Sequence, residues 1–125
     1  MPLTETFEKQ MLDWALGGAA GSQPTQRWIQ FATQSPTSQS AFDGPFTPRA
    51  TVTFAAANSP QMSKTNLNTI SVVTATAAGT AVGWNIYDRS VGGTRIAYGT
   101  TTANIGCKSG DQPALAPGQL KITLT

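Results

Sequence analysis

The stretch Val82-Gly-Trp-Asn-Ile-Tyr-Asp88, followed by Arg89-Ser-Val-Gly-Gly-Thr-Arg-Ile-Ala-Tyr-Gly99, decides the fold of this chain. Apolar residues alternate with small or polar ones from residue 82 to residue 87. A period of two is typical of a strand with one buried face. The alternation predicts that Trp84 and Ile86 point into the interior and that Asn85 points away from it.

The residues that follow predict a hairpin. Gly92-Gly93 can adopt the positive φ angles that a tight turn requires. The run 95–98 is a second segment of aromatic and β-branched residues. Two such runs around a glycine-containing loop are typical of a β-hairpin, which we expect at the centre of a sheet.

Further runs with strand character lie on both sides of this hairpin. They are residues 27–33, 49–55, 67–76 and 119–125, together with 100–105, which continues or follows the second strand of the hairpin. About seven strands separated by turn signals predict a mainly β protein, an antiparallel β-sandwich of jelly-roll-like type. With 125 residues we expect a single domain, 1–125, in which the sandwich occupies 27–125.

The segment 4–16 predicts an N-terminal helix. Thr4 can cap its start, and Gly17-Gly18 can end it. Phe7, Met11 and Trp14 follow the i, i+4, i+7 spacing of one apolar face. Because a helix of this length is marginal alone, we expect Phe7 and Trp14 to be buried on the sheet or in a subunit interface.

The connection 34–48 is long and contains three prolines. Loops of this length are usually functional or flexible, so it is either a contact surface or a plain surface loop. Its composition predicts mobility in the isolated protein and order in an assembly. The candidate interface residues from the helix and this loop are Phe7, Met11, Trp14, Gln34, Pro36, Phe42, Pro45 and Phe46.

The composition argues against several functional classes. Charged residues make up 11% of the chain, against about 25% in an average soluble domain, and the 19 threonines outnumber them. The net charge of +2 comes from scattered basic residues, so we expect no direct nucleic-acid binding. No apolar run is long enough to span a membrane, and the N-terminus does not resemble a signal peptide. We therefore expect synthesis in a cytoplasm and no membrane association.

Catalytic signatures are missing from the sequence. The chain has no histidine, and its six carboxylates lie in or beside the helix or in loops, so no acid–base or metal-ligand constellation stands out. We expect no enzymatic activity, no catalytic residues, no cofactor and no metal. Cys107 is the one cysteine; we expect a partly buried, inert thiol, with a reactive thiol or an interchain bridge as the alternative.

The order of these features along the chain resembles a family of small virion structural proteins of tailed bacteriophages, described as head-decoration or tail-fibre-like. The resemblance rests on structural punctuation rather than on a catalytic motif. Its parts are Met11-Leu-Asp-Trp-Ala-Leu-Gly-Gly18, Trp28-Ile-Gln-Phe-Ala-Thr33, Phe46-Thr-Pro-Arg49, Thr51-Val-Thr-Phe54, Val82-Gly-Trp84, Ile86-Tyr-Asp88, Gly92-Gly93, Gly110-Asp111 and Pro117-Gly-Gln-Leu-Lys-Ile-Thr-Leu124.

The resemblance implies a component of the virion, made in the host bacterial cytoplasm. The expected role is a capsid decoration protein that binds and stabilises the head surface as a homo-oligomer on the major capsid protein or other virion proteins. A tail or fibre-adaptor protein is the alternative. A third hypothesis is a carbohydrate-binding module with an exposed Trp28 or Trp84, although both lie in strand patterns that favour burial.

Overall fold

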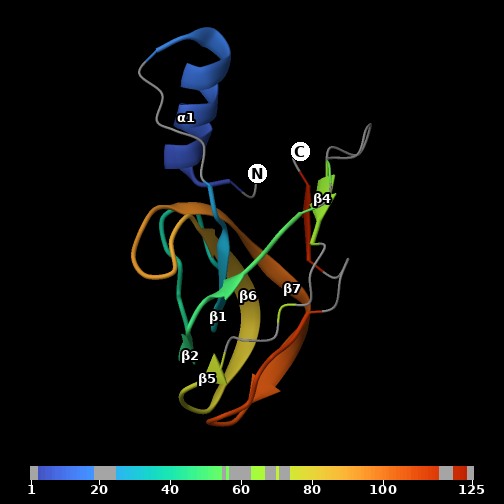
Figure 1. Ribbon diagram of the computed structural model, residues 1–125. Coiled ribbons are helices and arrows are strands. Elements are labelled where there is room, and N and C mark those ends of the chain that lie inside the picture. The colour runs from blue at the N-terminus through green and yellow to red at the C-terminus, as the bar shows by residue number, and fades with distance from the viewer. Residues whose placement is uncertain are drawn as a thin grey trace.

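The computed structural model describes residues 3–18, 25–54, 56, 63–66, 70, 74–115 and 120–123. These residues form one helix that stands on one end of a body of antiparallel strands (Figure 1). The helix is α1 (Glu5–Leu16). The strands are β1 (Trp28–Ala32), β2 (Phe46–Thr47), β3 (Ala50–Thr51), β4 (Ser63–Thr65), β5 (Thr74–Ala75), β6 (Gly79–Tyr87), β7 (Arg95–Cys107) and β8 (Lys121–Thr123).

The largest sheet has the strand order β3-β1-β6-β7. The hairpin predicted from the sequence is present as β6 and β7, and β6 lies inside the sheet between β7 and β1. In the antiparallel register of β1 and β6, Ile29 is opposite Ile86 and Phe31 is opposite Trp84. These four side chains point to the same face because side chains alternate along a strand, and all four are buried.

Two small antiparallel pairs, β2-β5 and β4-β8, complete the described strands. The buried cluster joins the large sheet to them through Phe46 of β2, Ala75 of β5 and Leu120, next to β8. The rings of Phe31 and Phe46 meet edge to face, with centroids 5.9 Å apart. The structure is thus mainly β and antiparallel with one N-terminal helix, which confirms the predicted fold class.

Helix α1 begins and ends as its sequence predicts. The Thr4 side chain accepts a hydrogen bond from the Phe7 amide, and Gly17 ends the helix at a φ of 93°. The residues just before the helix attach it to β7: Thr4 donates its amide hydrogen to the Ile96 carbonyl oxygen at 2.9 Å, and Leu3 forms a bridge with Ala97. The N-terminal end of the helix is therefore tied directly to β7.

Several boundaries differ from the predicted ones. The strand predicted at 49–55 is reduced to Ala50–Thr51, and Phe46–Thr47 forms a short strand inside the segment predicted to be loop. The run 100–105 continues β7, which is one of the two arrangements expected from the sequence. Much of the predicted strand 67–76, and the ends of 119–125, lie outside the described residues.

The central strand also differs from the prediction of one buried face. Trp84 and Ile86 are buried as expected, but Asn85 and Tyr87 on the opposite face are buried as well. The cause is the segment before β2, which packs over that face and brings hydrogen-bonding partners with it. A buried polar side chain is tolerated only when it is hydrogen-bonded.

Candidate functional site

The polar face of β6 holds the preceding loop through a connected set of hydrogen bonds. Asn85 donates from Nδ2 to the Ala41 carbonyl oxygen at 2.8 Å and to Asp43 Oδ1 at 2.9 Å. The Tyr87 hydroxyl donates to Asp43 Oδ2 at 2.6 Å. Arg95, on the neighbouring strand, donates to Asn85 Oδ1 at 2.9 Å. One carboxylate from the loop therefore satisfies two buried donors of the sheet.

Other contacts fix the same loop at both of its ends. Gln30 of β1 donates to the carbonyl oxygens of Gly44 and Phe46. Pro36 is buried, and its ring covers Gly83 so closely that an added Cβ there would lie 2.5 Å from Pro36 Cδ. Segment 34–48 is therefore tied to the sheet by polar contacts and by the packing of Pro36, which its composition did not predict. Its mobility in the isolated protein stays a prediction.

Electrostatics at this face keep Tyr87 protonated. Burial, then the hydrogen bond to Asp43 and the negative charge of that carboxylate, raise the pKa of Tyr87, while Arg49 and Arg95 oppose the rise. The Arg49 guanidinium lies 3.5 Å from the centre of the Tyr87 ring. Its Nη1 also donates to the carbonyl oxygens of Arg89 and Gly92, which ties the β6–β7 turn to the sheet.

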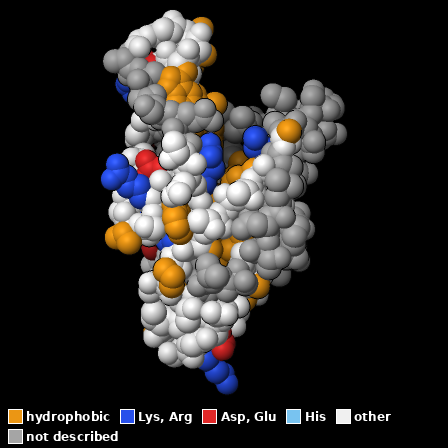
Figure 2. Space-filling model, viewed as in Figure 1, with side chains coloured by type: hydrophobic (Ala, Val, Ile, Leu, Met, Phe, Trp, Pro, Cys, Tyr) orange, Lys and Arg blue, Asp and Glu red, His pale blue; other side chains and the backbone are white. Residues whose placement is uncertain are grey.

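A groove of about 680 Å³ lies between α1 and the strands below it. Figure 2 shows the surface hollowed between the helix and the side of the molecule that carries β4. The apolar residues that line the groove include Phe7, Met11, Trp14, Val52, Phe54 and Ile122. Arg27 and Lys64 are the charged residues among its described lining, so the groove is apolar with a positive charge.

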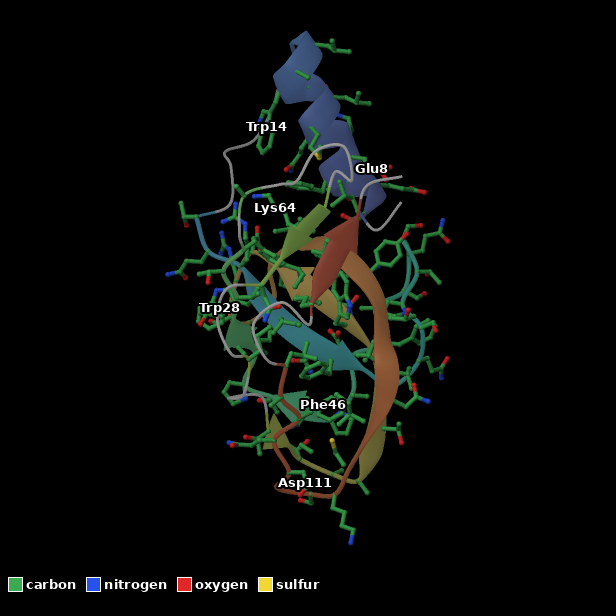
Figure 3. All side chains as sticks on the ribbon, turned by 90° about the vertical axis from the view of Figure 1, so that its right-hand side faces the viewer. Glu8, Trp14, Trp28, Phe46, Lys64 and Asp111 are labelled. Carbon is green, nitrogen blue, oxygen red and sulfur yellow. The ribbon has the colours of Figure 1, made fainter. Side chains whose placement is uncertain are left out.

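The structure brings together three of the eight candidate interface residues in this groove. Phe7 and Met11 are half-buried and pack against the core, while Trp14 keeps 39% of its surface exposed. The rings of Phe7 and Trp14 meet edge to face at 5.9 Å between centroids. In Figure 3, Trp14 lies on α1 above Lys64, and both residues line the groove. The expected burial of Phe7 and Trp14 is therefore only partial within one chain.

The five loop candidates do not form one surface. Phe46 is in the core and Pro36 is covered, so these two are structural residues. Pro45 is half-buried, Gln34 is exposed, and Phe42 is 41% exposed. Phe42 also has a φ of 52°, a left-handed conformation that bulky residues rarely adopt. It is held there by an antiparallel bridge between its neighbour Asp43 and Ala32.

Sequence reasoning missed the strand side of the groove and the hydrogen bonds that Asp43 accepts from the sheet. Val52, Phe54 and Ile122 were assigned only to strand patterns, and nothing local in the sequence places them opposite the helix. Asp43 was treated as one of several loop carboxylates. The buried Asn85 in the middle of a strand was the available signal, because such an amide needs a partner.

The tryptophans weigh against the carbohydrate-binding hypothesis. Trp84 is 4% exposed and packs against Gly99, where an added Cβ would lie 2.4 Å from the indole Cζ2. Its ring is therefore a core element. Trp28 is half-buried. A flat sugar platform needs an open ring face, which Trp84 does not offer.

Two features are absent from the described residues. No group of three or more acidic, cysteine or histidine side chains there is placed to hold a metal ion. Within the same part of the chain, no helix has the length and apolar character needed to cross a membrane.

The model of one protein family matches nearly the whole chain. This family is described as "Podophage GP4 fiber I protein gp80", and the match covers residues 2–123. The chain belongs to this family. It is a bacteriophage virion structural protein of the fibre-like type, as the resemblance in the sequence predicted. No curated protein matches the chain.

Membership of the fibre I family has consequences for role and location. A fibre protein is a component of the virion and associates with other virion proteins. It also points to a structural rather than an enzymatic role. An apolar groove beside a projecting helix suits such contacts between proteins.

Proposed function

We propose that this fibre I family protein is a tail fibre or fibre-adaptor component, which joins other tail proteins through its α1 end. The family match over residues 2–123 supports this role most strongly. The architecture adds a physical reason: the helix projects from one end of a body that is stiffened by the long β6–β7 hairpin (Figure 1).

The α1 end has the properties of an attachment surface. It combines the apolar groove with exposed leucines on the helix, whereas the face covered by segment 34–48 is already satisfied by internal contacts. Exposed apolar patches beside a groove are typical of protein-binding sites. Several copies that attach side by side would gain avidity even if each contact is weak.

Capsid decoration, the first role expected from the sequence, is the competing assignment. It would use the same rigid body on the head surface and stabilise the assembled shell by mass action. One argument for this role was a loop that becomes ordered on the particle. The hydrogen bonds that already tie segment 34–48 to β6 weaken that argument. The word "fiber" in the family description favours the tail.

Binding to isolated particle parts separates the two roles. Purified full-length protein is added to tails and to filled heads of the phage that encodes it, each prepared without this protein, and the bound copies are counted. The proposal predicts saturable binding to tails and none to heads. Saturable binding to heads together with slower heat-induced genome release would instead establish decoration.

A further inference from the structure

The outer face of α1, like the face that lines the groove, carries large apolar side chains. Leu12 and Leu16 are one turn apart, so they share a face, and they are 61% and 83% exposed. Glu8 precedes Leu12 by four residues and Glu5 precedes it by seven, which places both acids along the same stripe. The helix thus presents two leucines and two carboxylates away from its own groove.

The charge of this stripe is opposite to that of the groove. Lys9 and Asp13 form an ion pair at 2.9 Å and neutralise each other. In the part of the chain that the structure describes, Glu5 and Glu8 have no ion-pair partner. The described groove lining contributes Arg27 and Lys64 and no acidic residue.

We propose that the groove receives the outer face of α1 from a second copy of this chain. Leu12 and Leu16 of one protomer would then cover apolar groove residues such as Phe54 and Ile122 of its partner. The two carboxylates would approach Arg27 and Lys64. A groove of about 680 Å³ has room for several side chains, as ligand-sized cavities of roughly 300–1,000 Å³ do.

The geometry of one helix fixes the symmetry of this contact. Phe7, Met11 and Trp14 face the groove of their own chain, while Leu12 and Leu16 point away from it. Donor and acceptor surfaces are therefore different patches on each protomer. Such a heterologous contact repeats from copy to copy, and it produces a ring if the rotation closes or a longer assembly if it does not.

Sedimentation equilibrium of the full-length protein tests the contact. The expected mass rises with protein concentration beyond that of two copies, and the association weakens as salt is added, because the ion pairs are screened. The double variant Leu12→Glu/Leu16→Glu should weaken association by more than about a hundredfold. Val91→Glu is the matched control: Val91 is 84% exposed but lies in the β6–β7 turn, and its variant should associate as the unaltered protein does.

Charge reversal and mixing make the test specific. Arg27→Glu/Lys64→Glu and Glu5→Lys/Glu8→Lys should each weaken association, and their combination in one chain should restore it. Mixing the leucine variant, which keeps its groove, with the Arg27→Glu/Lys64→Glu variant, which keeps its helix face, should give a complex of two chains that grows no further. Melting curves of each variant show whether the fold is retained.

Three results would overturn the proposal. They are a monomer at all concentrations, association that is unaffected by the leucine variant, and a closed two-copy dimer of the unaltered chain. None of them depends on whether the protein attaches to a tail or to a head, because the measurement uses the isolated protein.

Discussion

The Tyr87 hydroxyl on β6 donates a hydrogen bond of 2.6 Å to Asp43, a residue 44 positions earlier in the chain. The same carboxylate accepts from the fully buried Asn85. This pair of contacts converts the polar side of the central strand into a packed face. It anchors segment 34–48 to the sheet.

Removing the Asp43 carboxylate should destabilise the protein. Asp43→Ala removes the acceptor of the Tyr87 hydroxyl and of one of the two Asn85 Nδ2 hydrogens, which we expect to lower the free energy of unfolding by about 1–3 kcal/mol. Asp13→Ala is the control, since it removes the half-buried carboxylate of an i, i+4 pair whose partner Lys9 is exposed, and it should cost less than about 0.5 kcal/mol. Urea unfolding of the three proteins measures both values. Equal stabilities would show that the network contributes nothing.

Tyr87 should make the protein sensitive to alkaline pH. The pKa of Tyr87 is raised from its ordinary value of 10.0, chiefly by burial, so above pH 10 the unfolded chain loses this proton before the folded one does. The unfolded state then binds fewer protons, and the free energy of unfolding falls as pH rises further. Tyr87→Phe should have a flatter pH profile above pH 10. Parallel profiles for the two proteins in that range would refute the assignment to Tyr87.

Two glycines of β7 offer a matched pair of substitutions. An added Cβ at Gly99 would lie 2.4 Å from the Trp84 ring, whereas one at Gly106 would meet nothing within 4 Å. Gly99→Ala must displace the indole and should cost about 1–3 kcal/mol, while Gly106→Ala should be neutral or slightly stabilising. Thermal unfolding monitored by tryptophan fluorescence compares them. If both variants melt alike, the indole does not pack against Gly99 as described.

The Cys107 thiol should react slowly in the folded protein. It is buried, and burial together with the charge of Asp111 raises its pKa, so the thiolate that reacts is scarce. We expect a disulfide reagent at neutral pH to label Cys107 only as fast as the protein opens, and to label it at once in denaturant. Rapid labelling without denaturant would instead support an accessible thiol available for an interchain bridge.

Local patterns carried most of the fold and little of the candidate site. The helix cap at Thr4, the turn at Gly92-Gly93 and the alternation around Trp84 are short-range signals, and the structure contains all three features. The groove is different because it joins α1 to strands far apart in the sequence. No local periodicity in the sequence indicates that Phe54 and Met11 line the same groove.

The covered face of β6 shows the same limit. Alternation correctly separated Trp84 from Asn85, but the partner that buries Asn85 comes from the loop before β2. Loop composition alone suggested mobility, since it counts apolar area and omits hydrogen bonds to a distant strand. For Trp84 the sequence was sufficient. The strand pattern predicted a position in the core, and the structure buries this side chain.

The most direct test of the tail assignment is a cryo-EM reconstruction of the complete virion without imposed symmetry, compared with that of a virion that lacks this protein. The account predicts difference density at the tail that fits the β body, with the α1 end directed toward neighbouring tail proteins. Difference density distributed over the head shell would contradict the tail assignment and support decoration. An unchanged virion would contradict a structural role in the particle altogether.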